Sequence, residues 1–462
     1  MIKNKYLQSI LIIDSASIKE VMRVIDHSGM RVAYIVDTKG KLAGVVSDSE
    51  IRRAILAGKD IKQSVKDVIN TKPIVIKDQE LGNEIKLRQK ISKLKKKMPD
   101  NRYILVLDKE NKPVDLLPTG RVIKKRKAIE ENQGTDTCVL VVGGAGYLGS
   151  VLVRQLLNEG YWVKVLDLLL YGIYPIEPLL SNNHFEFIEG DMRNISTLIK
   201  ALEGVDAVVN LAAIVGDPAC KNKPETAIET NFLANKALAE ACKYNQVNRF
   251  IYASTCSVYG AMEGDKPLTE DSPLNPVSLY ARSKIQSEEG ILSLEDENFS
   301  PTILRMSTLY GYSPRMRFDL VVNTMTKTAV VDGKIYVHGG GKQWRPLLNT
   351  EDAALAYLNC IRAPLTAIKG EIFNVGFSKL NYQIIQIAEV VKRCIPQAEL
   401  TIEGESADPR DYLVDFAKIE RALNYKANSG LEESISNIKT AIESGEIKNV
   451  DDPKYYNVEM NQ

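Results

Sequence analysis

Short apolar runs alternate with amphipathic stretches along the chain between residues 137 and 310. The apolar runs are rich in Val, Ile and Leu and have the length of strands, and apolar residues between them recur at helical spacing. This alternation is typical of a doubly wound parallel sheet with helices on both faces, whose ligands bind at the carboxyl ends of the strands. We expect strands at 138–142, 161–167, 185–189, 207–211, 249–254 and 302–305.

The first 125 residues have a different pattern, in which a helical stretch precedes two short strands. The pattern occurs twice, and its second copy is weaker. Turn residues separate the two strands of each copy. We therefore expect two related α/β modules, followed by a polar linker at 126–136. The expected strands lie at 32–37, 42–47, 103–108 and 113–117, with a helix at 80–97 before the second pair.

Charge is distributed unevenly, although the whole chain has a net charge of only +1. Residues 1–135 contain 29 Lys and Arg against 17 Asp and Glu, so this part is basic and the remainder is acidic. The basic runs 93–97 and 124–127 have no interleaved aromatic residues, and we interpret them as solvated surface rather than a nucleic-acid site. No apolar run reaches the roughly 20 residues that span a bilayer. The six cysteines are scattered, so we expect a cytoplasmic protein with neither a metal site nor a membrane partner.

A glycine-rich turn follows the first strand of the second domain. Gly143 allows the chain to turn, Gly146 allows the backbone to approach a pyrophosphate, and Gly149 allows the next helix to pack closely. Unpaired N–H groups at the start of that helix favour an anion. Asp167 ends the second strand, 18 residues after Gly149, where a carboxylate accepts hydrogen bonds from ribose hydroxyls and repels a 2′-phosphate. The pattern predicts a dinucleotide site that prefers NAD to NADP.

Two later loops extend this prediction. Asp191 follows the third strand, where its carboxylate can accept from an adenine amino group, and the small residues at 211–213 let the backbone lie against a cofactor. The expected cofactor-binding residues of these loops are Gly143, Gly146, Tyr147, Leu148, Gly149, Asp167, Asp191, Met192, Leu211, Ala212 and Ala213.

Tyr280 and Lys284 form the pattern with the most specific chemistry. A spacing of four on a helix places both side chains on one face. An unperturbed phenol has a pKa of about 10. A neighbouring ammonium and a cationic nicotinamide favour the phenolate, which can take a proton from a sugar hydroxyl as hydride leaves the carbon. Thr255, which lies upstream at the end of a strand, can share that hydrogen bond.

Residues 137–425 resemble the extended short-chain dehydrogenase/reductase family, specifically its NAD-dependent nucleotide-sugar epimerases and dehydratases. The resemblance implies that Tyr280 is the catalytic base, that Lys284 orients it and binds the nicotinamide ribose, and that Thr255 contacts the reacting hydroxyl. It also implies an NAD-binding part at about 137–310 and a smaller C-terminal substrate lobe at about 311–430 of a domain that spans 137–462. The resemblance rests on GGAGYLG at 143–149, GDMR at 190–193, NLAA at 210–213, STCSVYG at 254–260 and YARSK at 280–284.

The same resemblance implies contacts with a nucleoside-diphosphate sugar. Arg345 and Arg410 occupy positions where family members hold the diphosphate, a role that suits a planar bidentate donor. Asn323 is expected to contact the same nucleotide. The full expected substrate set is Thr255, Cys256, Ser257, Asn323, Arg345 and Arg410.

The residues after Thr255 depart from one branch of the family. Dehydratases have Asp and Glu directly after the catalytic threonine, whereas this chain has Cys256 and Ser257. Elimination of water therefore lacks its usual acid and base. We interpret Cys256 as a small packing residue rather than as a second base or nucleophile.

Residues 1–125 resemble a pair of CBS domains, tandem modules that often bind adenine nucleotides and regulate an attached enzyme. In that family a Ser or Thr followed three residues later by Asp holds phosphate and ribose. The first copy has Ser47 and Glu50 at these positions, and the second has Thr119 and Val122. The resemblance implies AMP, ADP or ATP at the first copy, and an oligomerisation scaffold without a ligand is the alternative.

The sequence therefore predicts a CBS-domain pair joined to a Rossmann-type enzyme that epimerises a nucleotide sugar at carbon 4 through a transient keto-sugar. The alternatives are a nucleotide-sugar dehydrogenase or ketoreductase, a dehydratase of the same family, and a non-catalytic sensor of NAD and nucleotides. Members of this family tend to dimerise and CBS pairs self-associate, so we expect a homodimer or a homotetramer.

Overall fold

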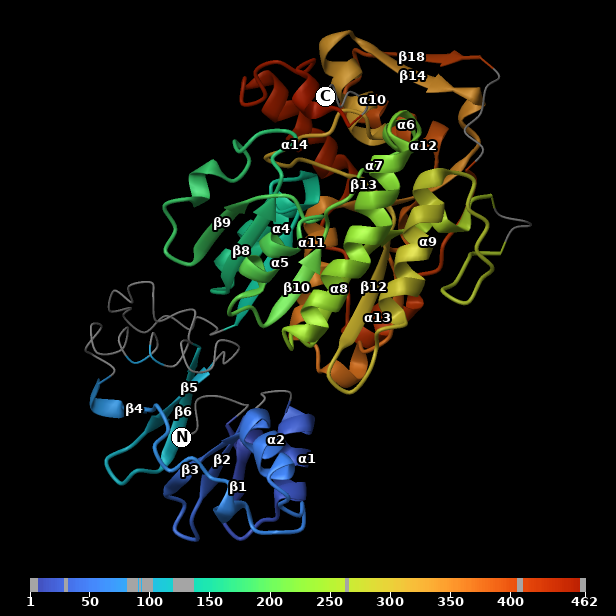
Figure 1. The fold of residues 1–462 in the computed structure, drawn as a ribbon. Helices are drawn as coiled ribbons and strands as arrows, with labels where there is room; N and C mark the ends of the chain where they lie inside the picture. The colour runs from blue at the N-terminus through green and yellow to red at the C-terminus, as the bar shows by residue number, and fades with distance from the viewer. Residues whose placement is uncertain are drawn as a thin grey trace. The chain divides into compact units, whose positions relative to one another are not determined.

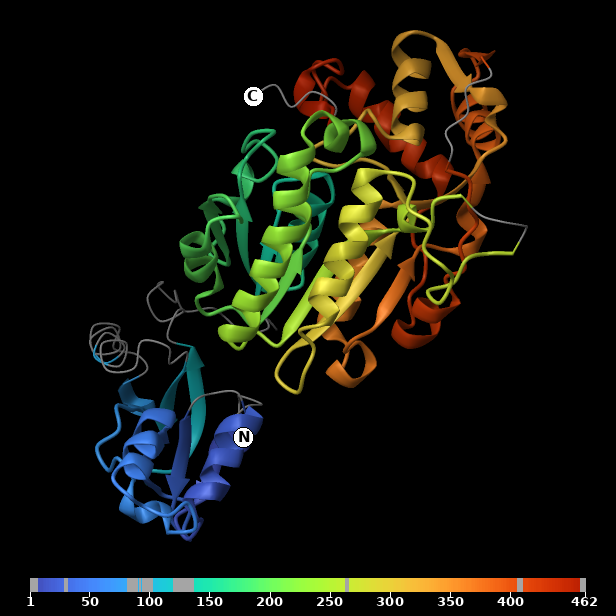
Figure 2. The ribbon, with the colours of Figure 1, turned by 45° about the vertical axis from the view of Figure 1, so that its right-hand side comes forward.

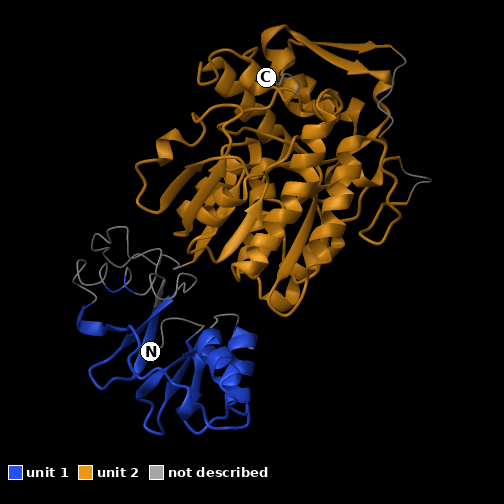
Figure 3. Cartoon of the chain, in the orientation of Figure 1, with its two compact units in different colours: residues 1–132 blue, residues 133–462 orange. Residues whose placement is uncertain are grey.

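In a computed structural model, the chain divides into two compact units, residues 1–132 and residues 133–462 (Figure 3). The linker expected at 126–136 lies outside the described residues, as do the basic run at 124–127 and most of the helix expected at 80–97. The structure describes residues 7–28, 32–80, 90, 93, 103–118, 137–261, 266–404 and 410–457.

The first unit contains two three-stranded sheets with the same pairing. In each sheet the first strand is parallel to the second, and the second is antiparallel to the third. One apolar core contains residues from both sheets. The elements are β1 (Leu11–Ile13), α1 (Ile18–Ser28), β2 (Val32–Val36), β3 (Leu42–Ser47), α2 (Asp48–Leu56), β4 (Ile76–Lys77), β5 (Tyr103–Leu107) and β6 (Pro113–Pro118).

The same turn closes both hairpins of the first unit. In each turn an aspartate, Asp37 or Asp108, accepts backbone hydrogen bonds of 2.8 Å from the residues two and four positions later. Gly40 (φ 76°) and Asn111 (φ 66°) have the same left-handed backbone at matching positions. The sequence repeat is therefore also a structural repeat.

A seven-stranded parallel sheet forms the centre of the second unit, which confirms the predicted doubly wound fold (Figure 1). The strand order is β16-β12-β11-β10-β7-β8-β9, so the chain starts in the sheet's interior and winds outward in both directions. The strands are β7 (Cys138–Val142), β8 (Trp162–Asp167), β9 (Phe185–Glu189), β10 (Ala207–Asn210), β11 (Arg249–Thr255), β12 (Ser300–Met306) and β16 (Ile372–Val375).

Helices cover both faces of this sheet. Figure 2 shows α8 and α9 side by side across one face, whereas α4 and α11 pack together on the other. A separate cluster of buried apolar residues lies on each face. These helices are α4 (Tyr147–Asn158), α5 (Ile195–Leu202), α6 (Asp217–Asn222), α7 (Pro224–Ile228), α8 (Ala234–Tyr244), α9 (Leu279–Leu292), α11 (Thr350–Arg362) and α13 (Ala417–Leu423).

A smaller lobe is built mainly from the C-terminal part of the second unit, and its helices share a third apolar core. None of the helices among the described residues is both long and apolar enough to cross a membrane. The lobe contains β13 (Thr308–Tyr310), α10 (Val321–Val331), β14 (Lys334–His338), β15 (Trp344–Asn349), β17 (Asn381–Gln383), α12 (Ile384–Cys394), β18 (Glu399–Glu403) and α14 (Leu431–Glu443).

The register of the large sheet brings the loops after three strands together. Val142 at the end of β7 pairs with Leu166 of β8 and with Asn210 of β10. Because parallel strands have their carboxyl ends at one edge, the residues that follow these positions become neighbours. The glycine turn, Asp167 and the 211–213 loop therefore meet at this edge.

Candidate active site

A cavity of about 1050 Å³ lies at the carboxyl edge of the large sheet, lined also by residues of the smaller lobe. Its volume is at the upper limit of ligand sites, which commonly have about 300–1,000 Å³, so it can hold two ligands together. The predicted residues that line it are Gly143, Gly146, Tyr147, Leu148, Gly149, Asp167, Asp191, Met192, Leu211, Ala212, Ala213, Thr255, Ser257, Tyr280, Lys284, Arg345 and Arg410.

The glycine turn forms a tight cradle at the start of α4. Gly143 has φ 83°, and a Cβ on it would lie 2.8 Å from the backbone nitrogen of Ala212. A Cβ on Gly149 would lie 2.2 Å from the carbonyl oxygen of Gly143. Gly146 is the N-cap residue of α4, so the unpaired N–H groups of the helix begin at the cavity. This cradle fits the diphosphate of a dinucleotide such as NAD.

The Asp167 carboxylate links the end of β8 to the glycine turn. Its oxygens accept hydrogen bonds from the backbone N–H groups of Ala145 (2.9 Å) and Leu169 (2.8 Å). Burial raises the pKa of Asp167, and these two donors oppose that shift. The carboxylate therefore fixes the turn and also lines the cavity.

Asp191 follows β9 and is held by Arg193. The guanidinium of Arg193 donates to the Asp191 carboxylate at 2.6 Å, and this hydrogen bond lowers the pKa of Asp191. Met192 beside it is buried. Both residues line the cavity, and the carboxylate is charged at neutral pH.

Tyr280 and Lys284 lie on the first two turns of α9, whose N-terminus is capped by Ser278. The Lys284 ammonium donates to the carbonyl oxygen of Ala253 at 2.8 Å and lies 5.8 Å from the centre of the Tyr280 ring. Burial lowers the pKa of Lys284 to about 8 and raises that of Tyr280. In the NAD-free site, burial therefore outweighs the charge of Arg317, which acts to lower the pKa of Tyr280.

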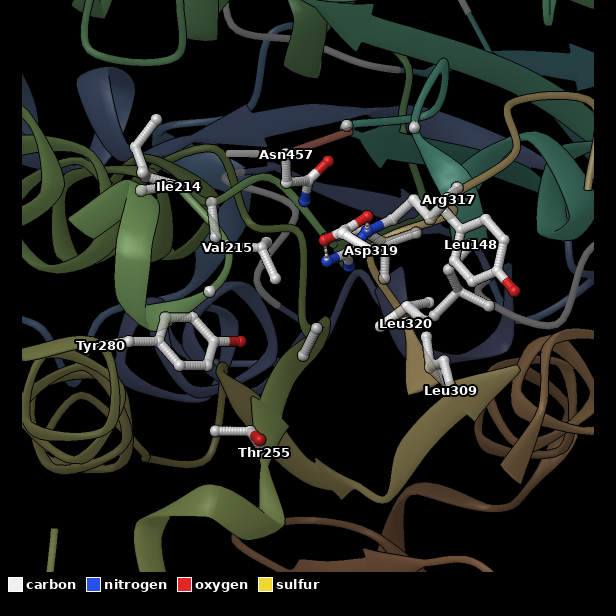
Figure 4. Close-up of a pocket in the computed structure, with 18 of the residues that line it drawn as sticks. Leu148, Ile214, Val215, Thr255, Tyr280, Leu309, Arg317, Asp319, Leu320 and Asn457 are labelled. Atoms are coloured by element: carbon white, nitrogen blue, oxygen red, sulfur yellow. Dashed lines mark hydrogen bonds and ion pairs between the residues drawn. The ribbon is translucent and has the colours of Figure 1, made fainter. Parts of the chain in front are cut away.

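Thr255 ends β11 and faces the same cavity as Tyr280 (Figure 4). Its hydroxyl accepts from the backbone N–H of Ser257 at 3.1 Å and donates to the Ser257 hydroxyl at 3.1 Å. Figure 4 shows the Tyr280 hydroxyl pointing into the cavity, with Thr255 on the adjacent wall. A substrate hydroxyl between these two side chains can donate to Tyr280, and it can accept from Thr255 when the threonine O–H turns from Ser257 to the substrate.

Cys256 does not line the cavity, although we expected it beside the sugar. It is fully buried, its thiol donates to the carbonyl oxygen of Arg305 at 3.2 Å, and burial raises its pKa. The backbone at the end of β11 directs this side chain into the apolar core below the sheet edge. Its role in the structure is packing, as the sequence interpretation preferred.

Asn323 also lies outside the cavity wall, in contrast to its expected role as a nucleotide contact. It is fully buried, and its amide donates to the Tyr147 hydroxyl and to the carbonyl oxygen of Arg317, each at 2.9 Å. Its carbonyl oxygen accepts from the N–H of Gly311 at 3.0 Å. Asn323 therefore joins α10 to the loop after β13 and to the start of α4.

Arg345 and Arg410 lie together on the part of the cavity wall that belongs to the smaller lobe. Arg345 donates to the carbonyl oxygens of Trp344 (2.7 Å) and Arg410. Arg410 forms an ion pair of 3.4 Å with Asp217. These contacts hold the Arg345 guanidinium against the backbone of Arg410, and both arginines line the cavity, where each can donate to a diphosphate.

The sequence prediction did not include several charged, aromatic and amide side chains of the cavity wall. They come from the loop after β8, the loop after β13 and the C-terminal segment. The alternation of charged and apolar residues at 315–319 is the only sequence signal we can identify for them. These residues are Tyr171, Arg315, Arg317, Asp319 and Asn457.

Ser47 and Glu50 of the first unit form a capping box at the start of α2. The backbone N–H of Ser47 donates to the Glu50 carboxylate at 2.7 Å, and the Ser47 hydroxyl donates to the same oxygen. The hydrogen-bond donors of Ser47 are therefore already bound to the Glu50 carboxylate. Thr119 and Val122, the corresponding positions of the second copy, lie outside the described residues.

Comparisons with known proteins agree with this geometry. Residues 139–376 match the NAD dependent epimerase/dehydratase family, and residues 9–57 match the CBS domain. A UDP-glucose 4-epimerase of Lactobacillus helveticus is 29% identical over 311 residues, which cover 62% of this chain and 91% of that protein. A human dTDP-D-glucose 4,6-dehydratase is 30% identical over 285 residues, covering 60% of this chain and 79% of the relative.

A solved structure of UDP-glucuronic acid 4-epimerase from Bacillus cereus, in complex with UDP-glucuronic acid and NAD, is similar with a TM-score of 0.60 and 27% identity. The similarity covers 67% of this chain and 99% of the other. The cofactor is NAD, as predicted. The chain is thus an enzyme of the NAD dependent epimerase/dehydratase family, and it carries an N-terminal CBS domain.

Proposed function

We propose that this enzyme is a nucleotide-sugar 4-epimerase. Tyr280 is its catalytic base and acid, Thr255 holds the reacting hydroxyl, and Lys284 orients the tyrosine and binds the nicotinamide ribose. The 4-epimerases among the similar proteins support this reaction. The substrate is a nucleoside-diphosphate sugar whose diphosphate is bound by Arg345 and Arg410.

NAD, once bound, accepts a hydride from the sugar carbon and returns it later in the cycle. Tyr280 takes the proton of the sugar hydroxyl as the hydride departs, which leaves a keto-sugar. Thr255 keeps the oxygen in line with Tyr280. After the keto-sugar has rotated in the site, Tyr280 gives the proton back to the sugar oxygen as the carbon is reduced on its other face, and NAD would end the cycle oxidised.

The cofactor lies, on this proposal, along the carboxyl edge of the sheet. The N–H groups at the start of α4 hold the diphosphate, Asp167 accepts from the adenosine ribose, and Asp191 accepts from the adenine amino group. The chain's own contacts support this arrangement, because Asp167 joins β8 to the glycine turn. Tyr280 and the loop at 211–213, which line the same cavity, would hold the nicotinamide end of the cofactor.

The orientation of Cys256 is the observation that most favours epimerisation over dehydration. A dehydratase needs an acid and a base beside the sugar in addition to the tyrosine. Here the residue after Thr255 points away from the cavity with a thiol whose pKa burial raises, and the next residue is a serine. Asp217 and Asp319 also line the cavity, but each pairs with an arginine.

The purified full-length protein, incubated with UDP-, GDP-, CDP- and dTDP-hexoses, tests the proposal by mass spectrometry and sugar analysis with NADH absorbance followed in parallel. A product of unchanged mass with an altered sugar, and no net NADH, is the expected result. Tyr280→Phe should lower the rate by about 100- to 10,000-fold. Loss of water from the sugar would show a dehydratase instead, and a two-hydrogen change a dehydrogenase or ketoreductase.

We further propose that the first unit regulates the enzyme or assembles it into oligomers. The mutual bonding of Ser47 and Glu50 favours the scaffold role, since an adenine nucleotide would have to replace these contacts. Calorimetric titration of the full chain with AMP, ADP and ATP distinguishes the roles when combined with its mass in solution. Binding that depends on Ser47 would support a sensor, and an oligomer that binds no nucleotide would support a scaffold.

A further inference from the structure

The Arg315 guanidinium is buried in the wall of the cavity, and it forms no ion pair with an acidic side chain in the part of the chain that the structure describes. Arg315 is 1% exposed, and its Nη2 atom donates to the Asn457 amide oxygen at 2.7 Å. The guanidinium carbon lies 3.7 Å from the centre of the Tyr171 ring. Its Nε–H group is buried and has no hydrogen-bond partner among the described residues. The neighbouring Arg317, in contrast, forms an ion pair of 2.5 Å with Asp319.

An unpaired cation in such a position is costly. Charged groups are buried in proteins when an opposite charge or a set of hydrogen bonds compensates them. Burial and the nearby Arg317 lower the pKa of Arg315 to about 10, so it still carries its charge at neutral pH. The stacking on Tyr171 compensates only part of the lost hydration. The geometry therefore calls for an anion in the cavity.

The loop that carries Arg315 packs on the first turn of α4. The Tyr147 hydroxyl donates to the carbonyl oxygen of Gly311 at 2.7 Å, and the Ser313 hydroxyl donates to the carbonyl oxygen of Tyr147 at 2.6 Å. Tyr171 belongs to the loop after β8, and the Arg315 charge opposes the rise in pKa that burial causes at Asp167, at the end of that strand. Arg315 thus lies among the segments that follow β7 and β8.

In folds of this type, the segment after the first strand contacts the diphosphate of a dinucleotide, and the end of the second strand contacts its adenosine ribose. The 12-residue helix α4 directs its N-terminal N–H groups into the same cavity. Arg345 and Arg410, which we assign to the substrate, make their contacts with each other, with Tyr412 and with Asp217. The anion beside Arg315 is therefore on the cofactor side of the site.

We propose that Arg315 is the counter-charge of the NAD diphosphate and that Tyr171 and Asn457 hold its guanidinium in place. Its Nε–H and remaining N–H groups donate to the diphosphate from the side of the smaller lobe. The backbone N–H groups at the start of α4 donate to it from the side of the large sheet. Because an epimerase reuses its cofactor in every cycle, such a contact retains NAD through the keto-sugar stage. The proposal rests on the placement of NAD at the glycine turn.

The C-terminal segment becomes part of the cofactor site through Asn457. Tyr455 accepts a hydrogen bond of 2.9 Å from the N–H of Phe318 on its carbonyl oxygen, and its ring packs edge-on against the Phe318 ring. These contacts fix the segment beside the Arg315 loop, and Figure 4 shows Asn457 on the cavity wall. Asn457 is then a positioning residue that acts on NAD through Arg315.

Calorimetry on NAD-stripped, full-length protein tests this inference with three ligands. NAD and ADP-ribose contain the diphosphate, whereas adenosine does not. Arg315→Gln should weaken NAD and ADP-ribose by about 10- to 100-fold, as expected for a charged hydrogen bond, and leave adenosine unchanged. Arg315→Lys and Asn457→Ala should each lose less affinity for NAD and ADP-ribose than Arg315→Gln does. Arg421→Gln, an exposed arginine on α13, is the control for charge.

The thermal stability of the same variants tests whether Arg315 has only a structural role. Removal of an uncompensated buried charge should leave the stability of the NAD-free protein unchanged or higher, while the rise in melting temperature on adding NAD becomes smaller. Equal weakening of adenosine, or a less stable NAD-free protein with unchanged NAD affinity, would overturn the proposal. So would an Arg315→Gln variant that loses only NADP or nucleotide-sugar affinity.

A substitution at Gly146 separates the role of Arg315 from the placement of NAD at the glycine turn. A Cβ on Gly146 would have the carbonyl oxygen of Gly143, at 3.2 Å, as its one neighbour within 4 Å, so a substitution here needs a smaller shift than one at Gly149. On the proposed placement, a larger side chain would occupy the position of the diphosphate. Gly146→Val should therefore weaken NAD. If Gly146→Val weakens NAD and Arg315→Gln does not, the role of Arg315 is refuted and the placement stands. If neither variant does, both are refuted.

Discussion

Replacement of Lys284 by methionine is expected to make the NAD-free protein more stable at neutral pH, although it removes an active-site residue. Lys284 is 2% exposed, and burial lowers its pKa from 10.5 to about 8. This shift corresponds to about 3 kcal/mol of unfolding free energy, because one pKa unit is worth about 1.4 kcal/mol. The hydrogen bond to Ala253, lost in the variant, contributes about 1 kcal/mol. The expected net gain is therefore about 2 kcal/mol.

The gain has a defined pH dependence. Below pH 8 Lys284 carries a proton in the folded and the unfolded chain, so the full penalty of burying its charge is present. Between pH 8 and pH 10.5 the unfolded chain binds more protons than the folded chain, so the stability of the wild type rises with pH. Above pH 10.5 both states are neutral and the penalty is absent. The methionine variant lacks this titration.

Urea unfolding of the full-length protein measures the difference. Both tryptophans, Trp162 and Trp344, belong to the second unit, so their fluorescence reports the unfolding of the part that contains Lys284. Lys448→Met, at an exposed position of the same unit, is the matched control. The reasoning is refuted if Lys284→Met is no more stable than the wild type at neutral pH. It is also refuted if the two proteins keep a constant difference between pH 8 and pH 10.5.

Three further substitutions test other parts of the site. Glu288→Ala should lower the unfolding free energy in urea by about 3–5 kcal/mol, because Arg305, 2.7 Å away and equally buried, would keep its charge without a partner. Gly149→Ala places a Cβ 2.2 Å from the carbonyl oxygen of Gly143, and NAD affinity by calorimetry should fall by about tenfold or more. Cys256→Ser should change kcat on the active nucleotide sugar by less than about threefold, since its side chain points away from the cavity.

Each of these three predictions has an outcome that would contradict it. Glu289→Ala, at the exposed neighbour of Glu288 on α9, is the matched control, and an equal loss of stability in both variants would show that the buried ion pair is unimportant. Unchanged NAD affinity in Gly149→Ala would mean that the turn does not bind the cofactor. A folded Cys256→Ser variant with a large loss of kcat would show that the thiol takes part in the reaction.

The sheet could be predicted from the sequence because its strands are buried on both faces. Such strands appear as continuous apolar runs, and β7 is buried at all five of its positions. The strand β16 was not predicted, since it has only four residues and includes Asn374. Its partner β12 precedes it by more than sixty residues. Pairing over such a distance leaves no local pattern in the sequence.

The residues of the candidate site were predictable to the extent that they belong to short motifs. A motif fixes the position of a residue on the chain but not the direction of its side chain. Thr255 and Cys256 are adjacent, yet one faces the cavity and the other faces the core. Asn323 could not be placed from spacing alone, because the helix face it occupies is set by its contacts with Tyr147 and Gly311.

Arg315, which the sequence did not predict, shares one electrostatic property with Tyr280 and Lys284. Burial opposes the charged form of Arg315, Lys284 and Tyr280 in the NAD-free protein. On the proposed placement, a bound NAD would bring phosphate charge to Arg315 and a cationic ring close to Tyr280, and so would favour the charged forms of both groups. The folding free energy lost on burying the Arg315 charge is then recovered in part on cofactor binding. Tight retention of NAD and a reactive phenolate would thus arise from the same buried charges.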